Sequence, residues 1–163
     1  MQNKKIAEIG MLIAVAFVLS YIEALIPISV GIPGVKLGLS NLVVMYALYR
    51  FSAKTTFGIA VVRIVLAGLT FGNLYSMLYS LAGGLLSFAG MLLLKKTGKF
   101  SLCGVSMAGG VLHNAGQILV ASIVLQTQLL VYYFPFLIVS GVAAGIAIGL
   151  VSGLLIQRMQ RKA

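Results

Sequence analysis

Repeated long apolar runs, joined by short links, constrain the fold of this chain more than any other feature. They lie at about Ile6–Ile26, Leu37–Tyr49, Thr55–Phe71, Leu74–Leu94, Leu102–Leu125 and Leu130–Ile156. An α-helix needs roughly 20 apolar residues to cross a bilayer, and all the runs except the second approach that length. The links leave no room for a soluble domain. The sequence therefore predicts a single domain over residues 1–163: an all-α integral membrane protein, built as a compact bundle of six transmembrane helices.

Composition supports this fold class. Only 9% of the residues are charged and 61% are hydrophobic, whereas a soluble domain has about 25% charged residues. The net charge of +10 would suit a nucleic-acid-binding protein if the basic residues formed a surface patch. They lie instead in short clusters between apolar runs, which excludes nucleic acid as a partner and predicts a multi-pass protein of the cell membrane. The first run is too long for a signal peptide, so we expect a retained span.

The basic clusters also predict orientation. Ten basic residues fall on one side of the predicted bilayer: Lys4, Lys5, Arg50, Lys54, Lys95, Lys96, Lys99, Arg158, Arg161 and Lys162. Because cytoplasmic loops are enriched in Lys and Arg, both termini are predicted to be cytoplasmic. The two remaining basic residues are Lys36 and Arg63.

Acidic residues are almost absent. The chain has no Asp, and its only acids are Glu8 and Glu23. Prenyl-transfer enzymes hold Mg²⁺-diphosphate through aspartate-rich motifs, and no phosphate-binding loop of the G-x-x-x-x-G-K-[ST] type is present either. His113 has no evident nucleophile or orienting acid in its own run, and the single Cys103 forms neither a disulfide nor a metal cluster. We therefore predict no catalytic residue, no metal and no cofactor, and expect that the chain is not itself an enzyme.

The short second run follows a Pro- and Gly-rich link at residues 27–36. Interrupted segments of this kind often mark a transporter's binding site. The start of the second helix, at Gly38–Asn41, would direct backbone N–H groups at a cavity, and Lys36, Asn41 and Asn73 would receive a carboxylate or phosphate from outside. The alternative is an ordinary extracellular loop with a solvated lysine.

Arg63 lies about nine residues into the third run, near the middle of the bilayer. An unpaired arginine at that depth costs at least about 2.5 kcal/mol. Glu23, near the outer end of the first run, is the nearest candidate for a structural ion pair. Otherwise an anionic ligand supplies the counter-charge.

The fifth run carries three polar residues: His113, Asn114 and Gln117. His113 and Gln117 are four residues apart and share one helical face. Such residues are either interhelical hydrogen-bonding groups, worth about 0.6 kcal/mol per contact, or ligand contacts. With Arg63 at a similar depth we favour the ligand site, with His113 as a hydrogen-bonding contact.

In the sixth run small residues recur every fourth position, at Gly141, Gly145, Gly149 and Gly153. A stripe of this kind lets two helix backbones approach closely. It predicts tight helix packing and no chemistry.

Several motifs together carry a family resemblance. They are Pro33-Gly34-Val35-Lys36-Leu37-Gly38-Leu39-Ser40-Asn41, Arg63, Leu78-Tyr79-Ser80-Leu81-Ala82-Gly83-Gly84, Gly104-Val105-Ser106 and His113-Asn114-x-x-Gln117. The chain resembles the Gx transporter family, which is widely labelled heptaprenyl diphosphate synthase component I. That family is similar to the substrate-binding S components of energy-coupling factor (ECF) transporters, which are six-helix membrane proteins with both termini cytoplasmic.

The resemblance implies a substrate-binding subunit for uptake of a small anionic or amide-rich metabolite or vitamin-like compound. It would dock onto a transmembrane coupling subunit with two ATPases, through small residues on the first helix, either Gly10 and Ala14 or Ala16 and Ser20. The alternative is a noncatalytic membrane component of a heptaprenyl diphosphate synthase. The expected binding residues are Arg63, His113, Asn114 and Gln117 inside, Lys36 and Asn41 towards the outside, and Glu23 and Asn73 as secondary contacts. The identity of the ligand does not follow from these residues.

Overall fold

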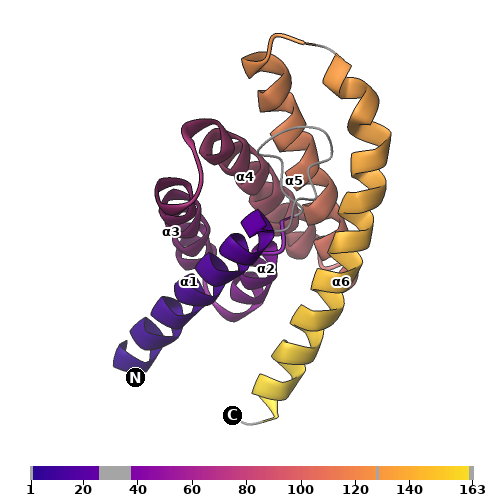
Figure 1. The fold of residues 1–163 in the computed structure, drawn as a ribbon. Helices are drawn as coiled ribbons and strands as arrows, with labels where there is room; N and C mark the ends of the chain where they lie inside the picture. Colours follow the sequence, from indigo (N-terminus) through magenta and orange to yellow (C-terminus); the bar gives the residue numbers. More distant parts are fainter. Residues whose placement is uncertain (1, 26–37, 128, 162–163) are drawn as a thin grey trace.

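The computed structural model describes residues 2–25, 38–127 and 129–161. These residues form α-helices and one short 3₁₀ helix, and no strand occurs among them, which confirms the all-α prediction. The helices are α1 (Gln2–Leu25), α2 (Asn41–Arg50), α3 (Ala53–Thr70), α4 (Leu74–Thr97), α5 (Leu102–Val124), η1 (Leu129–Tyr133) and α6 (Phe134–Gln160). The start of α1 and the end of α6 lie at the same end of the molecule (Figure 1).

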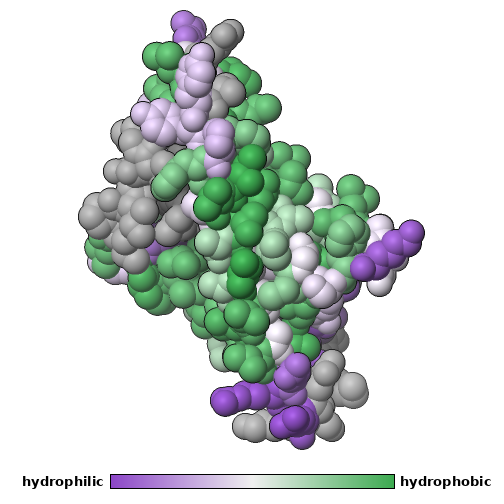
Figure 2. Space-filling view, turned by 90° about the vertical axis from the view of Figure 1, so that its right-hand side faces the viewer, coloured by the Kyte–Doolittle hydropathy of each residue, from purple (hydrophilic) through white to green (hydrophobic). Residues whose placement is uncertain are grey.

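Five of the helices are long and apolar enough to cross a membrane: Asn3–Leu25, Ala53–Thr70, Leu74–Thr97, Leu102–Val124 and Phe134–Met159. Large apolar side chains point outward from them, including Leu69 (74% exposed) and Ile123 (68% exposed). Apolar residues cover much of the face in Figure 2, and the most hydrophilic residues lie at its top, at its bottom and at its right-hand edge. An apolar surface of this extent is stable in the hydrocarbon core of a bilayer rather than in water.

The second run differs from its predicted form. Helix α2 has 10 residues, so at ~1.5 Å per residue it is about 15 Å long, half of the hydrocarbon core. It begins at Asn41 rather than at Leu37, because Gly38 has a φ of +84° and begins a turn closed by a 2.8 Å hydrogen bond from Asn41 N to Gly38 O. Six complete spans and cytoplasmic termini therefore stay predictions.

Both acids of the chain lie on α1, and both hold α1 to the segment that contains α2. Near the start of α1, Glu8 Oε1 accepts a hydrogen bond from Arg50 Nε at 3.2 Å. Near its end, Glu23 Oε1 accepts the backbone N–H groups of Gly38 and Leu39. Glu8 and Glu23 are about 22 Å apart along the helix axis. The two contacts therefore fix α1 and α2 side by side, in opposite directions, at both ends of α2.

Helices α5 and α6 pack through the predicted glycine stripe. A Cβ atom at Gly145 would lie 2.8 Å from the backbone oxygen of Ser106 and 2.9 Å from the backbone nitrogen of Met107. At Gly153 the nearest atom outside α6 is Leu102 Cδ2, at 3.9 Å. The prediction of close packing is confirmed, and the contact loosens towards the end of α6.

The contact with α5 is closer at Gly145 than at Gly153, which predicts different effects for two matched substitutions. Gly145→Ala forces α5 and α6 apart and should lower the free energy of unfolding by about 1–3 kcal/mol. Gly153→Ala gives the same gain in helix propensity as Gly145→Ala, roughly 1 kcal/mol. Its new methyl group lies near no backbone atom of α5. Thermal unfolding in detergent, followed by circular dichroism at 222 nm, measures both. Equal unfolding midpoints for the two variants would contradict the packing described here.

Candidate functional site

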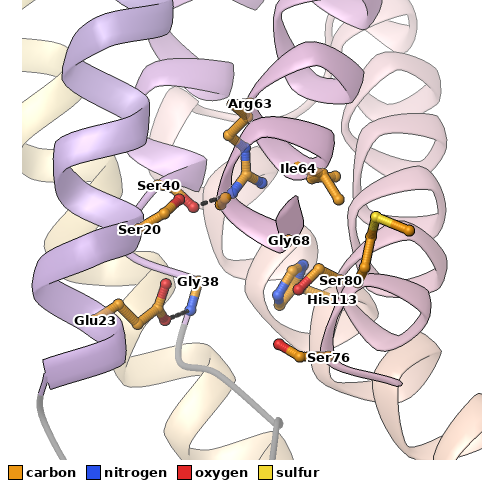
Figure 3. Close-up of a pocket in the computed structure, with 12 residues that line it drawn as sticks. Ser20, Glu23, Gly38, Ser40, Arg63, Ile64, Gly68, Ser76, Ser80 and His113 are labelled. Carbon is orange, nitrogen blue, oxygen red and sulfur yellow. Dashed lines mark hydrogen bonds between the residues drawn. The ribbon is translucent and has the colours of Figure 1, made fainter. Parts of the chain in front are cut away.

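A polar pocket lies between α1, α3, α4, α5 and the turn before α2 (Figure 3). Its walls carry one carboxylate, one guanidinium, one imidazole and four serine hydroxyls. The lining residues are Ser20, Glu23, Gly38, Ser40, Arg63, Ile64, Ala67, Gly68, Ser76, Met77, Ser80 and His113. With its open mouth the space measures about 350 Å³, and the enclosed part has room for about one water molecule.

Arg63 reaches from α3 across to the start of α2. Its side chain is only 5% exposed. Nη1 donates a hydrogen bond to Ser40 Oγ, and Nη2 donates to Asn41 Oδ1 at 3.0 Å. Arg63 Nε is buried and has no hydrogen-bond partner among the described residues. The guanidinium therefore donates to neutral acceptors, and its Nε–H group stays unused.

Among the residues that the structure describes, no acidic side chain forms an ion pair with Arg63. The ion pair found among the described residues joins Arg50 to Glu8. Glu23 is near enough to attract Arg63 through space, but more than 4.0 Å separates their charged atoms. The sequence left two alternatives for Arg63, an ion pair with Glu23 or an anionic ligand. The direct pair with Glu23 is not formed in the structure.

Glu23 is instead bound to the backbone at the start of α2. Its Oε1 atom accepts the N–H groups of Gly38 and Leu39, the latter at 3.3 Å. The sequence predicted that these backbone N–H groups face a ligand. A carboxylate near a helix N-terminus is a stabilising arrangement, so the protein's own anion occupies this position. The ligand contacts of the pocket therefore come mainly from side chains.

His113 enters the pocket from α5, and two glycines make room for it. A Cβ atom on Gly38 would lie 3.2 Å from His113 Cδ2, and one on Gly83 would lie 2.6 Å from the His113 backbone oxygen. Gly83 thus lets α4 and α5 approach closely at the level of the imidazole. His113 itself is 3% exposed.

Asn114 belongs to a different contact. Its Nδ2 atom donates to the backbone oxygen of Leu137 at 2.8 Å and to Ser140 Oγ at 3.3 Å. Both acceptors lie on α6. Asn114 therefore joins α5 to α6 and does not line the pocket.

The other predicted contacts among the described residues are also outside the pocket wall. Gln117 is fully buried beside Gly83. Asn41 accepts a hydrogen bond from Arg63 and does not itself line the pocket. Asn73 is exposed and caps α4, where its Oδ1 atom accepts the N–H of Ser76 at 2.8 Å. Lys36 lies outside the described residues. The structure thus brings together Glu23, Arg63 and His113 from the predicted set.

The four serines of the pocket were missed as site residues. Ser20 was predicted only as a small docking residue on the first helix. Ser76 and Ser80 are four residues apart on α4 and share one face, which was the available signal. Isolated serines in apolar helices are common in ordinary helix packing, so the signal is weak without Arg63 beside it.

The pocket is suited to binding rather than to metal chemistry. Within the described part of the chain, no group of three or more His, Cys, Asp or Glu side chains could hold a metal ion. The pocket offers hydrogen-bond donors and acceptors, one cation and one anion, beside the apolar side chains of Ile64 and Met77. Small-molecule sites combine an apolar wall with a few placed polar groups in this way.

These features define a polytopic α-helical membrane protein with a polar pocket inside its bundle. Within that class, the chain belongs to the family described as heptaprenyl diphosphate synthase component I, whose sequence model matches residues 12–155. The family resemblance is therefore confirmed, while the similarity to ECF S components stays an expectation. No curated protein and no solved structure matches the chain.

Two glycines with positive φ give a matched test of the pocket geometry. Gly38 (φ +84°) has Asn41 Nδ2 2.9 Å from its Cβ position, whereas Gly98 (φ +66°) has nothing within 4 Å. Alanine at either position adopts a left-handed backbone at a cost of about 1–2 kcal/mol. Gly38→Ala also displaces Asn41 and His113, so its loss of unfolding free energy should exceed that of Gly98→Ala by at least about 1 kcal/mol.

Chemical denaturation of both variants in detergent micelles measures the difference. Equal losses for Gly38→Ala and Gly98→Ala would show that the wall of the pocket is not packed as described.

Proposed function

We propose that this protein is a ligand-binding membrane subunit that holds a small anionic or amide-rich compound in the pocket between α1, α3, α4 and α5. The observation that carries the proposal is Arg63, a buried guanidinium that has an unused Nε donor and no ion pair within the described part of the chain. The catalytic or energy-supplying steps belong to partner proteins.

The energetics of Arg63 favour a ligand with an acidic or amide oxygen. A buried donor without a partner costs about 1–3 kcal/mol. A carboxylate or amide oxygen that accepts from Nε removes that cost, and a carboxylate adds a charge-assisted hydrogen bond. His113 and the serine hydroxyls supply further contacts on the facing wall of the pocket.

One assembly for such a subunit is an uptake system resembling the ECF transporters. Here the protein captures the compound near the outer side of the membrane, and a coupling subunit with two ATPases supplies energy. The short helix α2 beside the pocket supports this proposal, because interrupted helices are common at transporter binding sites.

The family description favours a second assembly, a heptaprenyl diphosphate synthase. In that case the protein is the noncatalytic membrane component, and a soluble partner carries the aspartate-rich catalytic site. The absence of Asp from the chain fits a division of labour between the two subunits. Under this proposal the pocket binds an anionic group of a substrate or regulator.

The binding proposal predicts the behaviour of two matched arginine variants. Protein purified in mild detergent should retain its compound, which mass spectrometry then identifies. Arg63→Gln should retain at least about 10-fold less, because a hydrogen bond to a charged group contributes roughly 1.5–3 kcal/mol. Arg50→Gln loses the same charge at an exposed position outside the pocket and should retain as much as the unmodified protein.

Equal retention by Arg63→Gln and Arg50→Gln would refute the role of Arg63, and an unmodified protein without any bound compound would refute the binding function. Proteins that co-purify decide between the two assemblies. A coupling subunit with ATPases supports uptake, and a soluble aspartate-rich synthase supports the second assembly.

A further inference from the structure

Basic side chains gather at the end of the bundle where α1 starts and α6 ends (Figure 1). Arg50, at the end of α2, reaches Glu8 of α1 there. Lys95, on the last turn of α4, donates a hydrogen bond from Nζ to the backbone oxygen of Leu48 on α2. The described basic residues of this end are Lys4, Lys5, Arg50, Lys54, Lys95, Lys96, Lys99, Arg158 and Arg161. Glu23, the other acid of the chain, lies near the opposite end of α1, so one carboxylate faces a large excess of cations here.

Two neighbouring helices bring lysines together at this end. The rings of Phe57 on α3 and Phe88 on α4 are in contact, with centroids 5.7 Å apart. Lys54 precedes Phe57 by three residues, and it therefore shares a face of α3 with that ring. Lys95 follows Phe88 by seven residues, which is about two turns, so it shares a face of α4 with that ring. At ~1.5 Å per residue the two lysines lie about 4.5 Å and 10.5 Å beyond the ring pair, towards the basic end.

Lys95 is the fixed member of a group that also contains Lys54 and Lys96, which we call the lysine cluster. Lys95 is half-buried, and its Nζ atom binds the backbone oxygen of Leu48 and lies 4.8 Å from the centroid of the Tyr49 ring. Both of these partners are uncharged. Lys54 and Lys96 are exposed, and no described acid forms an ion pair with any member of the cluster. An ammonium group that is already held in place loses little conformational entropy when it binds an anion.

The surface next to the lysine cluster is apolar. Phe57 is 43% exposed and Leu85 is 42% exposed. Lys96 follows Leu85 by eleven residues, which is about three turns, so both lie on one face of α4. Leu92 lies between them on this face and packs against the same core cluster as Ala53, at the start of α3. The helices therefore present cations at the end of the bundle and an apolar wall towards its middle, which complements the shape of a phospholipid.

We propose that an anionic phospholipid binds against α3 and α4, with its phosphate group at the lysine cluster and its acyl chains along Phe57 and Leu85. Basic residues near a membrane surface attract anionic headgroups. A zwitterionic headgroup carries its own ammonium group, which the lysines repel, so an anionic lipid is preferred. The site lies outside the pocket that Arg63 lines and does not depend on a ligand there.

The test compares two lipids that differ in headgroup charge. Full-length protein in detergent micelles is mixed with equal amounts of phosphatidylglycerol and phosphatidylcholine of identical acyl chains, and native mass spectrometry counts the molecules of each that stay bound. The unmodified protein should retain mainly phosphatidylglycerol. The double variant Lys54→Gln, Lys96→Gln should lower that preference roughly 10- to 30-fold, which is the effect of removing two lysines near an anionic group. Lys95 is left unchanged because it also supports the end of α2.

The double variant Lys4→Gln, Lys5→Gln is the matched control, since it removes two cations from the same end of the bundle but from α1. Its lipid preference should equal that of the unmodified protein. Equal losses in the two double variants would show a diffuse attraction to the whole basic end and would overturn the site. Equal retention of both lipids by the unmodified protein would also overturn it, and would leave the lysine cluster as a surface for an acidic protein.

Discussion

A guanidinium buried near the middle of an apolar bundle is the constraint on which the rest of this structure depends. Arg63 must be compensated, and the chain has only Glu8 and Glu23 to do so. Among the described residues, neither forms a direct ion pair with it. Both acids attach α1 to the segment containing α2, and the first turn before α2 supplies the neutral acceptors for Arg63.

This arrangement explains why α2 is short. The positive φ of Gly38 (+84°) is incompatible with a continuous right-handed helix through residues 38–41. The turn at Gly38 leaves the backbone N–H groups of Gly38 and Leu39 for Glu23, and it places Ser40 and Asn41 at the level of Arg63. Non-helical backbone is tolerated at membrane depth where it is buried in protein or lines a cavity, and both conditions hold here.

Much of the fold could be predicted from the sequence because its signals are strong and local. Five long apolar runs became helices whose ends lie near the expected residues. The glycine stripe of α6 predicted its contact with α5. The second run was predicted less well, since its boundary depends on a tertiary contact from Glu23.

The candidate site was predictable only in part. Arg63 and His113 stand out as costly residues in apolar runs, and both line the pocket. Asn114 stands out equally, but it directly follows His113 and so points about 100° away around the helix, towards α6. Which helix covers each face is a property of the packed bundle, and the pocket serines give only a weak local signal.

The central claim is that Arg63 is kept unpaired for a ligand, and a cryo-EM map of the protein purified from native membranes tests it most directly. The account predicts non-lipid density within hydrogen-bonding distance of Arg63 Nε, bounded by Glu23 and His113. An empty pocket in which Arg63 has turned to form a direct ion pair with Glu23 would contradict it.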